Sequence, residues 1–160
     1  MAGARFKVTG DPLDASAAVS LVSADEAGAV VTFVGMVRRE NAGRAVRFLD
    51  YEAYAPLAER AFERIEREIA ARWPGGRLSI HHRTGRVQIG EPSVVIAVAS
   101  PHRTEAFAAC RYAIERIKQV APIWKHEHFE GGEVWIEGAT ADPDDAAARA
   151  VALERACGSA

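Results

Sequence analysis

Lysine is rare in this sequence, and two of its lysines are candidates for chemistry. Of the 20 basic residues, 17 are arginine and only Lys7, Lys118 and Lys125 are lysine. Arginine carries a permanent charge on a planar group, whereas the lysine amine is compact and can lose its proton. A lysine kept in so arginine-rich a chain therefore points to proton transfer. The alternative for Lys118 is that it only faces the carbonyl end of its helix.

A second candidate is the segment Ser100-Pro101-His102-Arg103. Serine is a favourable helix N-cap and proline suits the first helical position, so the pattern predicts that His102 and Arg103 lie in the opening turn of a helix. The free backbone N–H groups of such a turn attract anions. The segment is therefore either a phosphate site or an ordinary helix start with a solvated arginine.

Two arginines, Arg38 and Arg39, end an apolar run, and side chains of neighbouring strand residues point to opposite faces. We therefore expect only one of them to face a pocket. Arg44 and Arg47, which follow, are predicted to be surface charges.

Metal and nucleophile chemistry are not favoured by the remaining residues. His126 and His128 share a strand face at ligand-like spacing, but no third histidine, cysteine or carboxylate is placed to complete a site, so no metal is expected. Cys110 lies on an apolar helix stripe and is predicted to belong to the core. The P-loop, GxSxG, GxGxxG and HExxH motifs are absent from the sequence, so NTP hydrolysis, serine hydrolase and zinc protease functions lack their usual signatures.

The elements that must position these residues follow from apolar periodicity. Apolar residues recur every three or four positions over 56–73 and 100–120, which predicts two long amphipathic helices. The second is expected to bury a stripe of Phe107, Cys110, Ile114 and Ile117, and Pro122 ends it. A short helix is predicted at 14–22, and strands at 28–35, 46–54, 78–84, 93–99, 123–129 and 133–137.

Together these elements predict an α+β fold, with the two long helices against a mixed or antiparallel sheet and a β-hairpin extension through Gly131-Gly132. The run 28–35 is predicted to be buried, and 93–99 to be central in the sheet. The length of 160 residues and the hydrophobic content of 49% favour a single domain over 1–160. The alanine-rich tail, 143–160, is expected to be helical or frayed and carries no signal of a site.

Charge and cysteine usage exclude several classes of protein. The formal charge of −2 gives no general attraction to nucleic acid or to an anionic membrane. The longest apolar run, 27–37, is shorter than the roughly 20 residues that span a bilayer. Cys110 and Cys157 are far apart in the sequence and form no CxxC motif. We therefore expect a cytoplasmic protein in a reducing compartment.

Helix geometry separates the two basic clusters. His102 and Lys118 are 16 residues apart on one predicted helix, and a rise of ~1.5 Å per residue places their backbones about 24 Å apart. One small ligand cannot easily reach both side chains in a single chain. Either the two clusters are unrelated, or two copies of the chain share one site, most simply as a two-fold homodimer.

The sequence resembles the large, catalytic subunit of molybdopterin synthase. The resemblance covers about 27–137, and it rests on the order and spacing of Phe33-Val-Gly-Met-Val-Arg38, Tyr51-Glu-Ala-Tyr54, His82-Arg-Thr-Gly85, Ser100-Pro-His-Arg103, Lys118 and Pro122-Ile-Trp-Lys-His-Glu127. The resemblance implies an α/β hammerhead fold with an added β subdomain. It also implies a sulfur transferase of molybdenum cofactor biosynthesis that converts cyclic pyranopterin monophosphate to the dithiolene molybdopterin, with no cofactor of its own.

The resemblance implies partners as well. A dimer of large subunits would bind two small ubiquitin-like subunits, giving a heterotetramer in the cytoplasm. Each small subunit would supply sulfur as a thiocarboxylate on its C-terminal Gly-Gly.

Residue roles follow by motif. The resemblance implies that Lys118 is the catalytic lysine and Lys125 the second active-site lysine. A lysine crowded by Arg38 and Lys125 would have a lowered amine pKa and would be a better proton shuttle near neutrality. The implied substrate-binding residues are Arg38, with His102 and Arg103 from the neighbouring large subunit, and the weaker candidates for pocket or partner contacts are Phe33, Arg39, Trp124 and Glu127.

Two positions depart from the family pattern. Met36 stands where members often carry Lys or Thr, and Ala139 where some carry an additional arginine.

Two rival functions stay open. One rival is a non-catalytic module that only binds a phosphorylated ligand or a partner's C-terminus. The retention of Lys118 and Lys125 argues against it. The other is an acyl or phosphoryl transferase in which Lys118 forms a covalent adduct.

Overall fold

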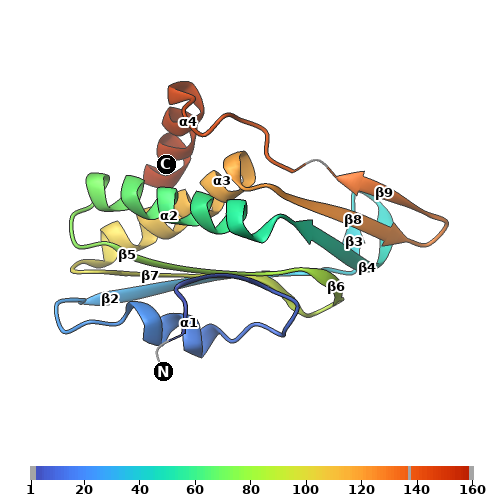
Figure 1. The fold of residues 1–160 in the computed structure, drawn as a ribbon, viewed down its shortest axis with the longest axis horizontal. Coiled ribbons are helices and arrows are strands. Elements are labelled where there is room, and N and C mark those ends of the chain that lie inside the picture. Colours follow the sequence, from blue (N-terminus) through green and yellow to red (C-terminus); the bar gives the residue numbers. More distant parts are fainter. Residues whose placement is uncertain (1–2, 137, 159–160) are drawn as a thin grey trace.

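The protein is described by a computed structural model over residues 3–136 and 138–158. Figure 1 shows helices on both faces of one sheet and a second sheet that extends beyond them. The helices of the described residues are α1 (Ala15–Val22), α2 (Ala55–Arg72), α3 (Arg103–Val120) and α4 (Ala146–Cys157). Their strands are β1 (Phe6–Thr9), β2 (Ala29–Met36), β3 (Glu40–Asn41), β4 (Arg44–Ala53), β5 (Arg77–Arg83), β6 (Gly85–Gln88), β7 (Pro92–Ser100), β8 (Ile123–Phe129) and β9 (Gly132–Ile136).

The first sheet has the strand order β1-β5-β7-β2. Its β1–β5 pair is parallel and the other pairs are antiparallel, so the sheet is mixed. The short helix α1 covers one face, α2 and α3 cover the other, and α4 lies on the far side of α3 (Figure 1). This arrangement confirms the predicted α+β class.

The core explains the unbroken apolar run of β7. Val94, Ile96 and Val98 pack in the cluster shared with α2 and α3. Their neighbours, Val95, Ala97 and Ala99, pack in the cluster shared with α1. A strand covered on both faces needs apolar residues at every position. The prediction that 93–99 is a central strand is therefore confirmed.

The second sheet follows the order β3-β4-β8-β9, and β6 also pairs with β4. The predicted hairpin is confirmed: Phe129 pairs with Gly132, so Glu130 and Gly131 form the turn, and Gly131 has a φ of 98° that favours glycine. Glu137, the predicted end of this hairpin, lies outside the described residues. The hairpin carries Lys125, His126 and His128.

The expectation that 28–35 is buried was wrong. The strand exists as β2, but it is the last strand of the sheet, and Val30, Phe33 and Val34 are 38%, 38% and 37% exposed. Apolar composition predicts burial in a folded chain, but it cannot tell a central strand from an edge strand.

The start of α3 also differs from the prediction. Ser100 is the last residue of β7, paired with Ala29, and its carbonyl accepts a hydrogen bond from the Gly28 N–H. The N-cap is therefore His102, whose side chain makes no capping bond, and the helix begins at Arg103. Cβ at Gly28 would lie 2.3 Å from the Pro101 carbonyl oxygen, so only glycine permits this close approach.

The burial of one α3 residue and two short strands also differ from the predictions. Phe107, expected on the buried stripe of α3, is 64% exposed, whereas Cys110 and Ile117 are buried. The strands β1 and β6 were not predicted, because each has four residues and little periodicity. Among the described residues, no helix has both the length and the hydropathy that crossing a bilayer requires.

Candidate active site

The last turn of α3, the edge strand β2 and strand β8 enclose a cavity of about 720 Å³, which we call the lysine cavity. Lys118, Lys125 and Arg38 all line it, together with Phe33. The described residues that line it include these three cations and no carboxylate. The other lining residues are Val34, Gly35, Met36, Tyr51, His82, Ser93, Val94, Ile114, Ile117, Ala121, Ile123, Ile136, Gly138 and Thr140.

Lys118 reaches the cavity because its helix ends just beyond it. The helix ends at Val120, and Ala121 takes an extended backbone conformation before Pro122. The Lys118 side chain is exposed in the last turn of α3, where a cation also faces the free carbonyl groups of the helix.

Lys125 enters the cavity from β8, where it pairs with Tyr51 of β4. Burial lowers the pKa of the Lys125 amine, and the positive charges of Lys118 and Arg38 lower it further, while Glu127 opposes them. The neutral amine of Lys125 is therefore easier to form than that of an ordinary lysine.

Arg38 is held at the cavity by a chain of polar contacts. Its Nη2 donates to the Asn41 side-chain oxygen at 3.3 Å, and the Asn41 amide donates to Glu127 Oε2 at 2.7 Å. Glu127 is buried, and its Oε1 accepts from Arg44 Nε at 2.9 Å. Glu127 thus acts behind the cavity wall and does not line the cavity.

This chain of contacts corrects one expectation and separates two arginines. Arg44, predicted to be a surface charge, is the ion-pair partner of the buried Glu127. Sequence spacing could not reveal this pair, because the two residues are 83 positions apart. Of Arg38 and Arg39, only Arg38 lines the lysine cavity.

Two further polar residues line the cavity, Tyr51 and His82, which lie in the family motifs but were not predicted to be site residues. Burial lowers the pKa of His82 to about 4, against a smaller opposing effect of the Arg83 carbonyl, so the imidazole is neutral at pH 7. Its Nδ1 donates to that carbonyl at 2.8 Å, which leaves Nε2 as an acceptor. Burial also raises the pKa of Tyr51, and a contact with Ser93 partly offsets it.

Cys110 is unsuited to nucleophilic chemistry. It is buried in the core beneath β2, as predicted, and burial raises the pKa of its thiol to about 12. A buried thiol with a raised pKa is inert. No cysteine is among the described residues that line the lysine cavity.

His102 and Arg103 lie elsewhere, at the opposite end of α3. They line a separate hollow of about 710 Å³, the helix-start pocket, with Arg72, Ser100 and Glu105 among its other residues. The two basic clusters of the sequence therefore do not meet within one chain, as the helix geometry required.

Trp124 lies just outside the lysine cavity. It is 43% exposed and lines a neighbouring groove with Trp135 and Ala139, while Ile136, Gly138 and Thr140 line both hollows. A chain end lying in this groove would lead directly into the lysine cavity.

One expectation about metal ligands was wrong. Glu133 lies opposite His128 across the hairpin and forms a group with His126 and His128 that could hold a metal ion. Glu133 was missed because it sits on the next strand, where the register of the hairpin places it opposite His128. This group faces away from the lysine cavity, since none of its members lines it.

The chain is similar to known proteins of one family. The family model described as MoaE protein matches residues 8–120. A molybdopterin synthase catalytic subunit of Halalkalibacterium halodurans is 45% identical over 136 residues, which cover 85% of this chain and 87% of that protein. A subunit of the same name from Bacillus subtilis is 48% identical, with coverages of 82% and 84%.

Solved structures show the same similarity. A crystal structure of molybdopterin synthase from Staphylococcus aureus matches with a TM-score of 0.82 and 42% identity, over 84% of this chain and 98% of that chain. A complex of subunits 1 and 2 of the molybdopterin-converting factor from Helicobacter pylori matches with a TM-score of 0.69 and 27% identity, over 84% and 91% of the two chains.

Proposed function

Because this chain belongs to the MoaE protein family, we propose that the lysine cavity is the place where sulfur is transferred to a pterin phosphate. The chain is a molybdopterin synthase catalytic subunit, a transferase of molybdenum cofactor biosynthesis. One observation carries the proposal for the cavity: Lys118 of α3, Lys125 of β8 and Arg38 of the loop after β2 line one hollow whose described residues include no carboxylate.

The residue types suit the chemistry. Cyclic pyranopterin monophosphate brings a negative charge, and each replacement of oxygen by sulfur requires that protons be moved as sulfur adds and oxygen leaves. Arg38 binds the anion, while Lys118 transfers protons and Lys125 supports it as the second active-site lysine. Lys125 has a lowered amine pKa, so its neutral form is more accessible near pH 7 than that of an ordinary lysine.

The solved complex of two subunits of the molybdopterin-converting factor supports a second, small subunit beside this one, and we propose that this small subunit is the sulfur donor. We propose that its C-terminal Gly-Gly thiocarboxylate enters the lysine cavity by way of the groove at Trp124 and Trp135. Because the nucleophilic sulfur arrives on the partner, this chain needs no reactive cysteine or serine, which agrees with the inert state of Cys110. Phe33 and Trp124 shape the entrance and do not react.

A second copy of the chain completes the site. His102 and Arg103 lie at the far end of α3 from Lys118, so they serve the phosphate bound in the neighbouring copy. The resulting assembly is a homodimer of this chain with one small subunit on each copy. The exposed apolar side chains Phe33, Val34 and Phe107 support a further protein contact. We place the assembly in the cytoplasm, because Cys110 and Cys157 are both free thiols.

The test combines the purified chain with a thiocarboxylated small subunit and cyclic pyranopterin monophosphate, and measures dithiolene formation. We expect product only when both are added. Lys118→Ala is expected to lower turnover by about 100-fold or more. Lys7→Ala is the matched control, because Lys7 is an exposed lysine on β1, away from the cavity, and should keep normal turnover. Near-normal turnover of Lys118→Ala would exclude the assigned role.

The rival functions give different results in the same assay. A binding module would take up the partner or the phosphate and form no product. A transferase with a lysine nucleophile would accumulate a covalent Lys118 adduct, detected by mass spectrometry, without any protein donor.

A further inference from the structure

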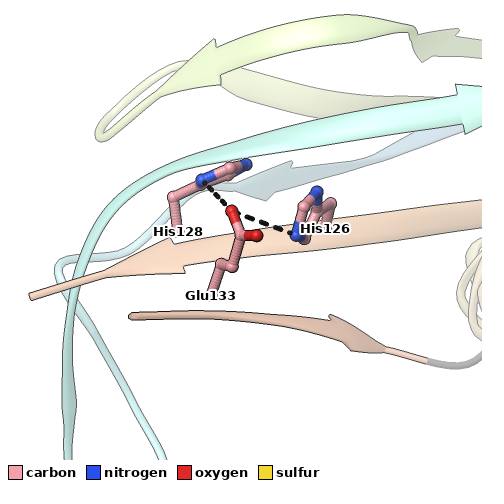
Figure 2. Close-up of side chains that lie close together, drawn as sticks. All are labelled: His126, His128 and Glu133. Carbon is pink, nitrogen blue, oxygen red and sulfur yellow. Dashed lines mark ion pairs between the residues drawn. The ribbon is translucent and has the colours of Figure 1, made fainter. Parts of the chain in front are cut away.

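Three side chains gather on the outer face of the β8–β9 hairpin, and we call them the hairpin cluster: His126, His128 and Glu133. Figure 2 shows both imidazoles and the carboxylate pointing toward one another from adjacent strands. The two histidines are two residues apart on β8 and so share a face, and Glu133 is the direct cross-strand neighbour of His128.

The distances match those between ligands of one metal ion. Glu133 Oε2 lies 3.4 Å from His128 Nδ1 and 3.6 Å from His126 Nε2. Two ligand atoms at tetrahedral positions about 2.0–2.1 Å from a zinc ion are separated by about 3.3–3.4 Å. The ligand atoms of all three residues lie within 4.8 Å of one another. Only small side-chain movements would therefore bring them onto one ion.

A carboxylate lies behind one of the histidines. Asp50 Oδ2 of β4 is 3.1 Å from His128 Nε2, although the two atoms are not aligned as a hydrogen bond. The other oxygen of Asp50 faces Arg86 at 3.9 Å. A carboxylate that accepts a hydrogen bond from the outer nitrogen keeps the proton there and leaves the lone pair of the inner nitrogen for a metal, and Asp50 is close enough to His128 to take this role once the two atoms align. This arrangement is typical of histidines that bind metals.

Aromatic rings hold the two imidazoles in place. The Trp135 ring stacks on His126 with centroids 4.3 Å apart, and the Phe48 ring stacks on His128 at 4.4 Å. Rings that are already packed lose little conformational freedom when an ion binds. The cluster is thus preorganised by β4, β8 and β9 together.

We propose that the hairpin cluster binds a divalent transition-metal ion of the zinc type. Two imidazole nitrogens and one carboxylate oxygen are donors that suit Zn²⁺, and water would take the fourth position. The site is separate from the lysine cavity, because Lys125 and Glu127 alternate with the two histidines along β8 and point to the opposite face. The ion would join β8 to β9 and so brace the strand that carries Lys125.

The test uses the full chain after removal of metals with a chelator. Titration with Zn²⁺, followed by calorimetry, is expected to give one ion per chain. Addition of Co²⁺ should give the intense visible absorption of a tetrahedral site. Glu133→Gln and Asp50→Asn are each expected to weaken binding by about tenfold or more, and His128→Ala to weaken it further. Zn²⁺ should also raise the midpoint temperature of thermal unfolding of the unmodified chain, and it should leave that of His128→Ala unchanged.

Two matched controls make the result specific. Glu130→Gln changes an exposed glutamate of the same hairpin turn, and His102→Ala removes an exposed histidine outside the cluster. Both should bind Zn²⁺ as the unmodified chain does. Equal binding by the control and cluster variants, substoichiometric binding, or a weak octahedral Co²⁺ spectrum would overturn the proposal. Because Co²⁺ spectra need no variant, a folding defect in one variant leaves the test decisive.

Discussion

At the scale of single residues, the state of each lysine depends on its neighbours in space. Composition singled out Lys118 and Lys125 as unusual, and both line the lysine cavity. Lys125 is half-buried on β8 and close to two other cations, and its amine pKa is lowered. The shift arises mainly from burial, which no sequence pattern near Lys125 reports.

The first prediction concerns this coupling. Removal of the positive charge in Lys118→Met should raise the pKa of Lys125 toward the ordinary lysine value, because Lys118 disfavours the second cation. Resonances of ¹³C-labelled lysine side chains, followed as a function of pH, measure the change, and the chain has only three lysines to assign. Lys7→Met is the control and should leave the Lys125 titration unchanged. An unchanged or lowered Lys125 pKa in Lys118→Met would contradict the assigned contact.

At the scale of elements, the position of α3 matters most, because it carries His102 at one end and Lys118 at the other. A buried ion pair fixes it against α2: Arg116, fully buried, donates to both oxygens of Glu68 at 2.8 and 2.9 Å. Tyr112 and Arg64 also donate to Glu68. Burial disfavours the Glu68 charge, but these donors outweigh burial and hold its pKa below the ordinary value.

The second prediction follows from the unequal surroundings of the two partners. Glu68→Ala leaves the buried guanidinium of Arg116 without a counter-charge and should lower the free energy of unfolding by about 3–5 kcal/mol. Arg116→Met should cost less, because Glu68 keeps two donors and methionine fills the space. Urea unfolding measures both losses, and Glu63→Ala, an exposed change on the same helix, is the control. Equal losses in the two variants would contradict the asymmetry.

The Glu68 pKa also sets a dependence on pH. Because the folded pKa lies below the unfolded one, Glu68 stabilises the fold fully above its unfolded pKa of about 4.5. This contribution is lost as the pH falls through the folded pKa. The unmodified chain should therefore lose stability in acid more steeply than Glu68→Ala.

At the scale of the whole molecule, the separation of the lysine cavity from the helix-start pocket is the main structural fact. Lys118 and His102 lie at opposite ends of one rigid helix, so only a second copy can bring them to one ligand. The expectation of a single domain over 1–160 stays a prediction, which one cooperative unfolding transition would test.

The third prediction tests the shared site by complementation. Lys118→Ala and His102→Ala should each be inactive as homodimers. When the two are coexpressed, half of the dimers are mixed, and each mixed dimer has one site with both residues intact. Activity should therefore return to about a quarter of that of the unmodified protein. Mass spectrometry verifies that mixed dimers form. If they form and activity does not return, Lys118 and His102 either act in a site of the same chain or act in two separate sites.

The sequence by itself determined the local elements and the main chemical groups. The two long helices, predicted at 56–73 and 100–120, the hairpin and the central strand β7 followed from periodicity, proline and glycine, because these features act between neighbouring residues. The resemblance to the family, through the order of its motifs, pointed to Lys118, Lys125 and Arg38.

Only the tertiary structure decided which of these groups meet. The pairing of β4 with β8 and of β8 with β9 places Arg44 on Glu127 and Glu133 beside the histidines, and the edge position of β2 exposes Phe33. These contacts join residues that are distant in the chain or on different strands. They depend on strand register and burial, which arise from the packing of the whole chain and leave no local pattern in the sequence.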